Sequence, residues 1–433
     1  MKLTVGQVMK STLGARLPVG VPHIEVDGAF VDSRDAIEGA LFVGLKGDSH
    51  DGAHYAPEAL RNGAAAALIS ESSFLWLEGE LQAIGKPVIL AKSPLEVLQN
   101  SGRLALQRLG AKVVAITGST GKTTTKDILV AMLRAAGARA EGTPGNRNTE
   151  IGVPMSLMGL PGDTEIAVIE MGMRGMGQIA ELATLAPPDV GCITSIGPVH
   201  LELLGTVENV AAAKFELLAA LAPGSTAVVP RGERFLQDLL ETLDPQVRVV
   251  AFGEKPDLDL DMNLSTGWQQ RCAAAALECA RAVGRAPEAG ARVEVALSAM
   301  RGNIRELRVG GVLIEDCYNA NPIAMRAALA DLAERPGRRV AVLGDMMELG
   351  QDELRFHREV GEAAAAAGVE LIVAVGERAA AYPEGAPGVP AVHYATVDEA
   401  VAGVPEQLRS GDVVLLKGSR SMALERVSAV IAG

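Results

Sequence analysis

A lysine and two threonines follow a pair of glycines at the end of a short apolar run. Val113–Thr117 is rich in β-branched residues and leads into Gly118-Ser119-Thr120-Gly121-Lys122-Thr123-Thr124. Backbone N–H groups of such a loop can surround phosphate oxygens, and a helix that begins there adds partial positive charge. Lys122 can reach terminal phosphates, and the Thr123 hydroxyl can bind Mg²⁺. The pattern T-G-x-x-G-K-T therefore predicts a nucleotide phosphate loop rather than an ordinary glycine turn.

Two further polar residues follow predicted strands of the same segment. Glu170 comes directly after Ile166–Ile169, and His200 lies six residues beyond a strand that ends at Thr194. Ligands of open parallel sheets bind beyond the carboxyl ends of the strands. Mg²⁺ takes a few protein oxygens together with water and nucleotide phosphates. We expect both residues to serve a magnesium site, although a solvated strand end and a loop histidine without a role are the plain alternatives.

Lys214 lies on an apolar face of a helix predicted over residues 207–221. Its neighbours one turn away are Val210, Ala211, Leu217 and Leu218, and no acid stands three or four residues from it. Such a lysine either extends its amine to water or is buried for a purpose. Burial disfavours the ammonium form, and a neutral amine can react with CO₂ to give a carbamate with metal-binding oxygens.

Polar clusters also follow strands elsewhere in the chain. In the last third, Asp316–Pro322 and Leu343–Gly350 each follow an apolar run, and His357 lies on the next predicted helix. In the first third, Asp32-Ser33-Arg34 forms a polar loop of the same kind. Each cluster could be an ordinary turn, because Asn, Asp, Ser and Pro favour turns.

The elements that must position these residues fall into three α/β segments. The 433 residues are 48% hydrophobic and only 3% aromatic, which favours helices on parallel sheets over an all-β fold. Apolar runs alternate with helical patterns throughout. We therefore expect domains at 1–110, 111–306 and 307–433, the second carrying the phosphate loop. The predicted strands are 40–45, 64–69, 87–91, 113–117, 166–169, 190–194, 312–315, 339–343, 370–375 and 412–416.

The charge, hydropathy and cysteine content of the chain limit which partners and which cellular location we expect. A net charge of −13, from 53 acidic and 40 basic residues without a basic block, argues against nucleic acid and anionic membranes. The chain shows no secretory apolar region at Met1-Lys2-Leu3-Thr4 and no 18-residue apolar run, so we expect a cytoplasmic protein without membrane insertion. No C-x-x-C spacing suggests zinc, so free thiols are expected at Cys192, Cys272, Cys279 and Cys317.

Taken together, the motifs resemble the Mur ligase family over nearly the whole chain. The resemblance rests on the phosphate loop, Asn148–Pro154, Glu170-Met171-Gly172 and the spacing of His200 from Lys214-Phe215-Glu216. Motifs of the last third match the branch that adds a dipeptide: Asp316–Pro322 with Met325, Leu343–Gly350 with His357, and Lys417-Gly418-Ser419-Arg420 with Met422.

The resemblance implies an ATP-dependent amide ligase of peptidoglycan precursor synthesis. A small N-terminal α/β domain would hold a UDP-sugar, the central phosphate-loop domain ATP, and a Rossmann-like C-terminal domain would close over both. The substrates implied are ATP, UDP-muramoyl-tripeptide and D-alanyl-D-alanine, and a monomer is expected. Two alternatives stay open, namely another ligase of the family that adds a single amino acid, and a nucleotide switch that uses the loop without making a bond.

The resemblance also implies roles for individual residues. Lys122, His200 and Lys214 would be catalytic. Nucleotide would contact Gly118, Ser119, Thr120, Gly121, Lys122, Thr123, Thr124, Asp316 and Asn319. Two Mg²⁺ ions would contact Thr123, Glu170, His200 and a carbamylated Lys214. The other substrates would contact Ser33, Arg34, Asn148, Thr149, Asn321 and Asp345.

Two stretches depart from the family pattern. Around residues 258–272 the chain is shorter, and Gln270 stands where an adenine-contacting Asn is expected. Alternatively, Gln270 is a solvated residue in the first turn of a helix over 271–283. We therefore expect weak discrimination of ATP from GTP, about tenfold, the scale of one modest hydrogen bond. Arg301-Gly302-Asn303-Ile304-Arg305 matches a Gly-Arg pattern only loosely, which leaves open which arginine faces phosphate.

Overall fold

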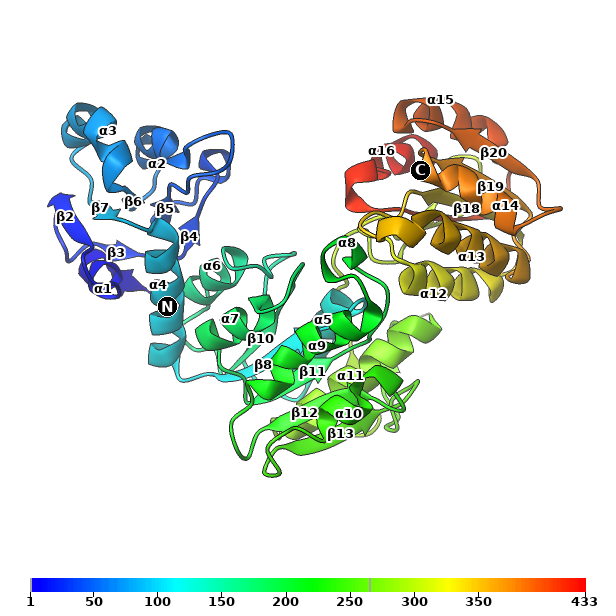
Figure 1. Cartoon of the computed structure of the whole chain (residues 1–433), viewed down its shortest axis with the longest axis horizontal. Coiled ribbons are helices and arrows are strands. Elements are labelled where there is room, and N and C mark those ends of the chain that lie inside the picture. Colours follow the sequence, from blue (N-terminus) through cyan, green and yellow to red (C-terminus); the bar gives the residue numbers. More distant parts are fainter. Residues whose placement is uncertain (1, 265) are drawn as a thin grey trace.

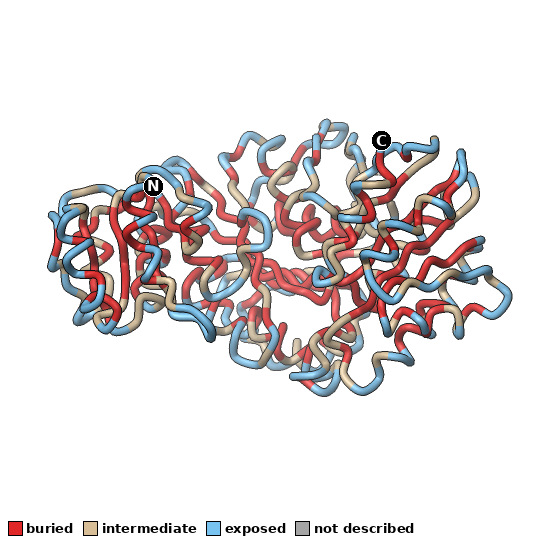
Figure 2. The backbone as a smooth tube through the Cα atoms, turned by 90° about the horizontal axis from the view of Figure 1, so that it is seen from above, coloured by how far each residue is buried: buried red, intermediate tan, exposed pale blue. Residues whose placement is uncertain are grey.

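The chain folds around three separate β-sheets, each covered by helices on both faces. The computed structural model describes residues 2–264 and 266–433, so Met1 and Ser265 lie outside the described residues. The first and third units stand like two arms on the central one (Figure 1). Buried residues fill the interior of the molecule, and exposed residues lie mostly along its outer edge (Figure 2). The expected three-part α/β architecture is confirmed.

The first sheet has the strand order β2-β7-β6-β5-β4, with only β2 antiparallel to its neighbour. Side chains alternate across it, so that Leu41 and Val43 face α1 and α4 while Phe42 faces α2 and α3. A two-stranded ribbon of β1 and β3 lies beside it. The bounds are β1 Leu3–Thr4, α1 Val5–Lys10, β2 Arg16–Val19, β3 Glu25–Val26, β4 Ala29–Phe30, β5 Leu41–Val43, α2 Ala56–Arg61, β6 Ala66–Ser70, α3 Glu71–Ile84, β7 Val88–Ala91 and α4 Pro94–Leu109.

The second sheet is parallel throughout, in the order β13-β12-β11-β8-β10-β9. Helices α5 and α11 cover one face, and α6, α7 and α9 cover the other. A two-stranded pair, β14 and β15, accompanies α5. The bounds are β8 Lys112–Thr117, α5 Lys122–Ala135, β9 Ala140–Gly142, α6 Gly152–Met158, β10 Ile166–Glu170, α7 Gln178–Leu185, β11 Val190–Ile193, α8 Leu201–Leu204, α9 Val207–Ala219, β12 Thr226–Pro230, α10 Gln237–Leu240, β13 Arg248–Phe252, β14 Asp261–Met262, α11 Gly267–Ala282 and β15 Arg292–Val293.

The third sheet has the order β16-β17-β21-β18-β19-β20, with only β16 antiparallel. Helices α12, α13 and α14 pack on one face and α15 and α16 on the other. Because β16 pairs with β17, we propose that the third domain begins near residue 303, slightly before the expected 307. The bounds are β16 Asn303–Glu306, β17 Gly311–Glu315, α12 Pro322–Ala333, β18 Arg338–Gly344, α13 Glu353–Ala366, β19 Leu371–Val375, α14 Tyr382–Gly385, β20 Ala391–Tyr394, α15 Val397–Gln407, β21 Asp412–Lys417 and α16 Glu425–Ile431.

Helix α4 joins the first unit to the second. A Cβ on Gly102 would lie 2.7 Å from the Pro154 Cα of α6, so only glycine allows the two helices to approach this closely. The helix ends at Gly110, whose φ of 66° gives the left-handed cap typical of glycine. Among the described residues, no helix is both long and apolar enough to cross a bilayer. All four cysteines are buried free thiols, as expected.

Candidate active site

The loop between β8 and α5 has the geometry that phosphate binding requires. Gly118 has a φ of 152°, and a Cβ there would lie 1.9 Å from the Thr194 hydroxyl oxygen. Gly121 has a φ of 85° at the N-terminus of α5, and a Cβ there would lie 2.8 Å from the Trp268 ring. Glycine is therefore needed at both positions, and the N-terminus of α5 is left available to an anion.

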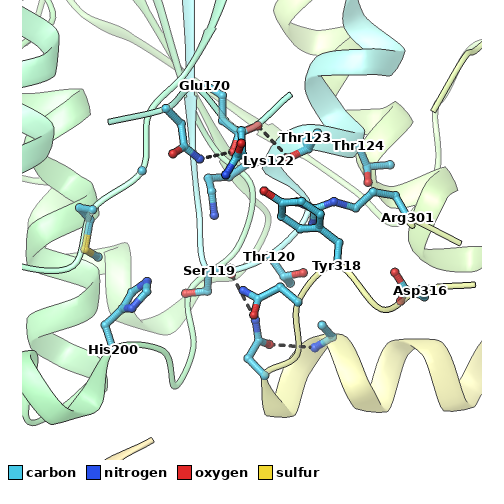
Figure 3. Close-up of a pocket in the computed structure, with 18 of the residues that line it drawn as sticks. Ser119, Thr120, Lys122, Thr123, Thr124, Glu170, His200, Arg301, Asp316 and Tyr318 are labelled. Carbon is cyan, nitrogen blue, oxygen red and sulfur yellow. Dashed lines mark hydrogen bonds between the residues drawn. The ribbon is translucent and has the colours of Figure 1, made fainter. Parts of the chain in front are cut away.

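This loop lines a cavity of about 910 Å³ between the second and third units. In Figure 3, Lys122, Thr123 and Glu170 lie together, His200 stands at the opposite margin from Asp316, and Tyr318 faces the loop. The cavity gathers these residues of the expected site: Ser119, Thr120, Gly121, Lys122, Thr123, Thr124, Asn148, Thr149, Glu170, His200, Lys214, Asp316, Asn319 and Asn321.

Lys122 points back to its own loop. Its Nζ donates to the Gly118 carbonyl oxygen at 2.9 Å. Burial lowers the pKa of Lys122; nearby Glu170 opposes this shift, and Arg301 adds to it. The lysine therefore lies next to a second cation, an arrangement that an anion with several negative oxygens would relieve.

Glu170 is held in a fixed orientation at the end of β10. The carboxylate accepts from the Thr123 hydroxyl at 2.8 Å and from the Asn148 side-chain amide at 2.7 Å. The Glu170 N–H in turn donates to the Thr143 hydroxyl at 2.9 Å. Asn148 was expected on the substrate side, whereas here its amide orients the glutamate.

The oxygens of Thr123 and Glu170 suit Mg²⁺, which prefers hard oxygen ligands and keeps several waters and phosphate oxygens. Within residues 2–264 and 266–433 no cluster of three or more His, Cys, Asp or Glu side chains could hold a metal alone. An ion here would therefore take its remaining ligands from nucleotide and water, as expected for an ion that arrives with ATP.

Lys214 is buried in α9, with only 2% of its surface exposed, and it lines the cavity. Its Nζ has no hydrogen bond or ion pair to any residue that the structure describes. Burial lowers the pKa of Lys214 well below its ordinary value, and the charge of Lys122 lowers it further. The amine is thus favoured in its neutral, nucleophilic form.

His200 precedes α8 in a left-handed conformation, with a φ of 54°. Its Nδ1 hydrogen bonds to the Glu348 carboxylate, which belongs to the third unit. Burial lowers the pKa of His200; Glu348 opposes this shift, and Lys214 adds to it.

The third unit closes the cavity with the loop after β17. Lys417 donates to the Asp316 carboxylate at 2.6 Å and to the Asn319 carbonyl at 3.1 Å, which fixes this loop. The Asn321 side chain caps α12 by accepting from Ala324 N at 2.9 Å, and donates to the Ser119 carbonyl at 3.3 Å. One asparagine therefore joins the third unit to the phosphate loop.

Arg301 lines the cavity although its role was left open by the sequence. Its guanidinium carbon lies 3.9 Å from the centre of the Tyr318 ring. Its Nε is buried and unpaired within the described part of the chain. Such a donor, held on an aromatic face near Lys122, is suited to phosphate oxygens.

One part of the cavity, here called the slot, is lined by residues at the start of α11 and along α12. Thr266, Trp268 and Gln269 contribute from the start of α11, and Ala324, Ala327, Ala328 and Asp331 from α12. Gln270, expected to contact the base, is not among the lining residues. The reason is local: α11 begins at Gly267 after the Thr266 cap, so that Gln269 and Gln270 point about 100° apart around the helix.

Three expected substrate residues lie outside this cavity. Ser33 donates to Glu58 at 3.2 Å and Arg34 donates to Asp32 at 2.9 Å, both in the first unit. Asp345 is buried inside the third unit, where it accepts from Ala379 N at 2.7 Å. Gly118 also lies outside the lining, and contributes the carbonyl that holds Lys122.

Family models match all three units of the chain. The Mur ligase family catalytic domain matches residues 25–104, the Mur ligase middle domain 116–273, and the Mur ligase glutamate ligase domain 300–420. The UDP-N-acetylmuramoyl-tripeptide–D-alanyl-D-alanine ligase of Bacillus subtilis is 32% identical, across 99% of this chain and 98% of the relative.

Solved structures agree with these matches. MurF from Acinetobacter baumannii superposes with a TM-score of 0.83 at 27% identity, over 99% of this chain and 98% of that one. MurF ligase from Thermotoga maritima in complex with ADP gives a TM-score of 0.77 at 28% identity, over 94% and 97%. From its sequence, its three sheets and its phosphate loop, the chain belongs to the Mur ligase family.

Proposed function

We propose that this Mur ligase joins D-alanyl-D-alanine to the terminal carboxylate of UDP-N-acetylmuramoyl-tripeptide and splits ATP to ADP and phosphate. The observation that carries the proposal is the meeting of the phosphate loop and the third-unit loop around one cavity. The relatives that match over nearly the full length carry this activity in their names.

The reaction has two steps. A carboxylate oxygen of the tripeptide attacks the γ-phosphorus, ADP leaves, and an acyl phosphate forms. The dipeptide amine then attacks the acyl carbon, the tetrahedral intermediate expels phosphate, and the amine proton is lost. Activation is needed because a carboxylate oxygen is a poor leaving group until it carries phosphate.

The chain supplies position and charge for these steps. Lys122, released from Gly118, would contact the transferring phosphoryl group, and Arg301 would approach it from the segment just before β16, stacked on Tyr318 of the third unit. Both act by stabilising charge that develops in the transition state. The slot beside Trp268 would receive the base, with Gln269 in place of Gln270.

We propose that the ATP enters with Mg²⁺ and that two ions bind near Thr123, Glu170 and His200. Bound Mg²⁺ would neutralise phosphate charge and polarise the γ-phosphoryl group. Glu170 is preorganised for this role by its two hydrogen-bond donors, Thr123 and Asn148.

Lys214 would add a further pair of oxygens as a carbamate. Its neutral amine nitrogen attacks the carbon of CO₂, an N–C bond forms, and one proton is released to water. The support is the burial of Lys214 and the absence of any described hydrogen-bond partner of its Nζ. The negative carbamate would also offset the positive charge of Lys122 beside it.

The first unit would bind the UDP-sugar, with Ser33 and Arg34 on its polar loop, and Thr149 of the second unit would contact the same substrate from the cavity. Asn319 and Asp316 would contact the nucleotide from the third unit. We propose that the enzyme works in the cytoplasm, where ATP is available, and as a monomer.

The test is phosphate release from ATP in the presence of UDP-muramoyl-tripeptide and one of several amines. We expect release with D-alanyl-D-alanine and little with D-alanine or D-glutamate alone. Equal release with a single amino acid would favour another ligase of the family. Release that needs no amine would contradict ligation altogether. A Lys122→Ala variant provides the background, with turnover on the order of 10²–10³ lower.

A further inference from the structure

The imidazole of His200 is held by a residue of another unit. His200 Nδ1 hydrogen bonds to the Glu348 carboxylate, and the other oxygen of that carboxylate lies 3.7 Å from Arg174 Nε. The backbones also meet, because Leu201 N donates to the Glu348 carbonyl oxygen at 2.9 Å. The loop before α8 and the loop after β18 are thus joined through both side chain and main chain.

Both partners of this contact have an unusual backbone. His200 has a φ of 54° and Glu348 a φ of 63°, although neither is glycine. Such conformations persist only where surrounding contacts impose them, and they gather at functional sites. The Glu348 loop is anchored inside its own unit: Met346 N donates to His357 Nε2 at 3.0 Å, and Met347 N to Ser419 Oγ at 3.0 Å.

The hydrogen bond from Nδ1 to Glu348 determines the state of Nε2, the other nitrogen of the His200 ring. When Nδ1–H donates to a carboxylate, Nε2 carries the lone pair and the ring plane is fixed. His200 lines the cavity, whereas Glu348 does not. Glu348 therefore acts on the cavity through His200 and not by direct contact.

We propose that Glu348 is a positioning residue that orients His200 toward a divalent cation, and that it does so only when the third unit is docked. Lys122, Thr123, Glu170 and Lys214 all belong to the second unit. Glu348 thus makes the cation side of the ATP site sensitive to the presence of the third unit. The proposal rests on the proposed function, since it assumes that the nucleotide enters with Mg²⁺.

The test compares ADP binding with and without Mg²⁺ by titration calorimetry on the full chain. We expect Glu348→Ala to raise the Mg²⁺ concentration needed for half-maximal enhancement of ADP binding by about 10–100-fold, the usual range for loss of an outer partner of a ligand. ADP binding in EDTA should be unchanged. Glu348→Gln, which keeps an acceptor oxygen, should show a smaller effect. Glu202→Ala is the control, because this glutamate is exposed on α8 near His200 and binds no described residue.

A double-substitution cycle separates positioning from a plain link between units. If Glu348 acts through His200, Glu348→Ala should have little further effect on the Mg²⁺ dependence in a His200→Ala background. An unchanged Mg²⁺ midpoint in Glu348→Ala, equal losses with Mg²⁺ and with EDTA, or fully additive effects would each overturn the proposal. Neither ligation substrate is used, so a failed ligation assay would count against the proposed function alone.

Discussion

At the scale of single residues, the part of the cavity around Lys122 brings several positive groups together, although the lining as a whole holds as many acidic as basic side chains. Lys122, Lys214 and Arg301 all line the cavity, and Glu170 is the nearby acid that raises the pKa of Lys122 against the effect of burial. Like charges at short range are costly unless an anion enters. The residues are therefore arranged for a polyanion such as the phosphates of ATP.

Substitution of Arg301 tests directly whether these positive groups stabilise the reacting phosphate. We expect Arg301→Ala to lower turnover on the order of 10²–10³, because one preorganised contact to developing charge is lost. Arg305→Ala is the matched control: Arg305 lies four residues later, donates to Ser428 at 3.4 Å and does not line the cavity. Steady-state phosphate release would measure both. Equal losses in the two variants would show that Arg301 has no special role.

The burial of Lys214 predicts how the stability of the folded chain depends on pH. The pKa of Lys214 is lowered in the folded chain, so the unfolded chain binds more protons, and the stability contributed by this residue rises with pH. In bicarbonate-free buffer we expect Lys214→Met to melt at a higher temperature than the parent chain at pH 7. The difference should shrink as the pH approaches 10.5, the ordinary value for lysine.

Bicarbonate supplies the control for that experiment. A carbamate formed only in the folded state would raise the melting temperature of the parent chain but not that of Lys214→Met. A difference that stays constant from pH 7 to 10, together with no response to bicarbonate, would contradict a neutral, reactive lysine.

Sequence reasoning reached some of these residues and not others. Lys122, Glu170 and Lys214 could be found because each is marked locally, by a glycine loop, a strand end or an apolar helical face. Arg301 and Gln269 carry no such mark. Their position depends on how the third unit packs on the second and on where α11 begins, and a shift of one residue rotates a helical side chain by about 100°.

At the scale of elements, local signals placed the strands well. The strand expected at 113–117 is β8 at Lys112–Thr117, and the helix expected from residue 207 is α9, capped by Thr206. Edge strands without a strong apolar run were missed, among them β9 at Ala140–Gly142 and β16 at Asn303–Glu306. Edge strands such as these bury fewer side chains and so leave a weaker pattern. An apolar inner strand was missed as well, β12 at Thr226–Pro230, which is fully buried between β13 and β11.

Helices α11 and α12 meet end to side across the boundary between units. Asp331 of α12 accepts from Gly267 N at 3.0 Å, at the first residue of α11. A carboxylate near a helix N-terminus is stabilising, and such caps contribute about 1 kcal/mol. Since both helices line the slot proposed for the base, this cap would couple docking of the third unit to nucleotide binding.

We therefore expect Asp331→Ala to weaken ADP binding about fivefold, the equivalent of about 1 kcal/mol. Asp331→Asn keeps an acceptor oxygen at the same distance and should lose less. Fluorescence of Trp268 provides a signal, because this tryptophan lines the slot while Trp76 is exposed on α3. Identical ADP affinities for the alanine variant and the parent chain would show that Asp331 does not contribute to nucleotide binding.

At the scale of the whole molecule, the first and third units contribute unequally to the cavity at the phosphate loop. The third unit already contacts the phosphate loop through Asn321, whereas Leu95 of α4 is the one described residue of the first 110 that lines the cavity. The first unit stands apart from the third as a separate arm (Figure 1). A UDP-sugar held on its polar loop would be remote from the phosphate loop in this arrangement.

The proposed reaction requires the first unit to move closer to the phosphate loop. An acyl phosphate must be protected from water, and the tripeptide carboxylate must reach the γ-phosphate. The first unit joins the second through α4, which ends at Gly110 and packs along α6, and Met155 and Met158 of α6 lie in the core of the first unit. We therefore expect closure to bend the chain near Gly110 and to shift α4 along α6. Hinge bending and shear between packed helices are the usual ways in which such a unit moves.

We expect the ligand-free chain to have a radius of gyration above the about 22 Å of a compact chain of 433 residues, and to contract toward that value when ADP and the UDP-tripeptide are both present. Small-angle scattering measures the change directly. ADP alone should produce little contraction, because the third unit already contacts the phosphate loop and the first unit gains nothing from nucleotide. Full contraction with ADP alone would contradict this prediction, because it would show that nucleotide by itself drives the closure. No contraction with both ligands would show that the tripeptide reaches the phosphate loop by another path than closure of the first unit.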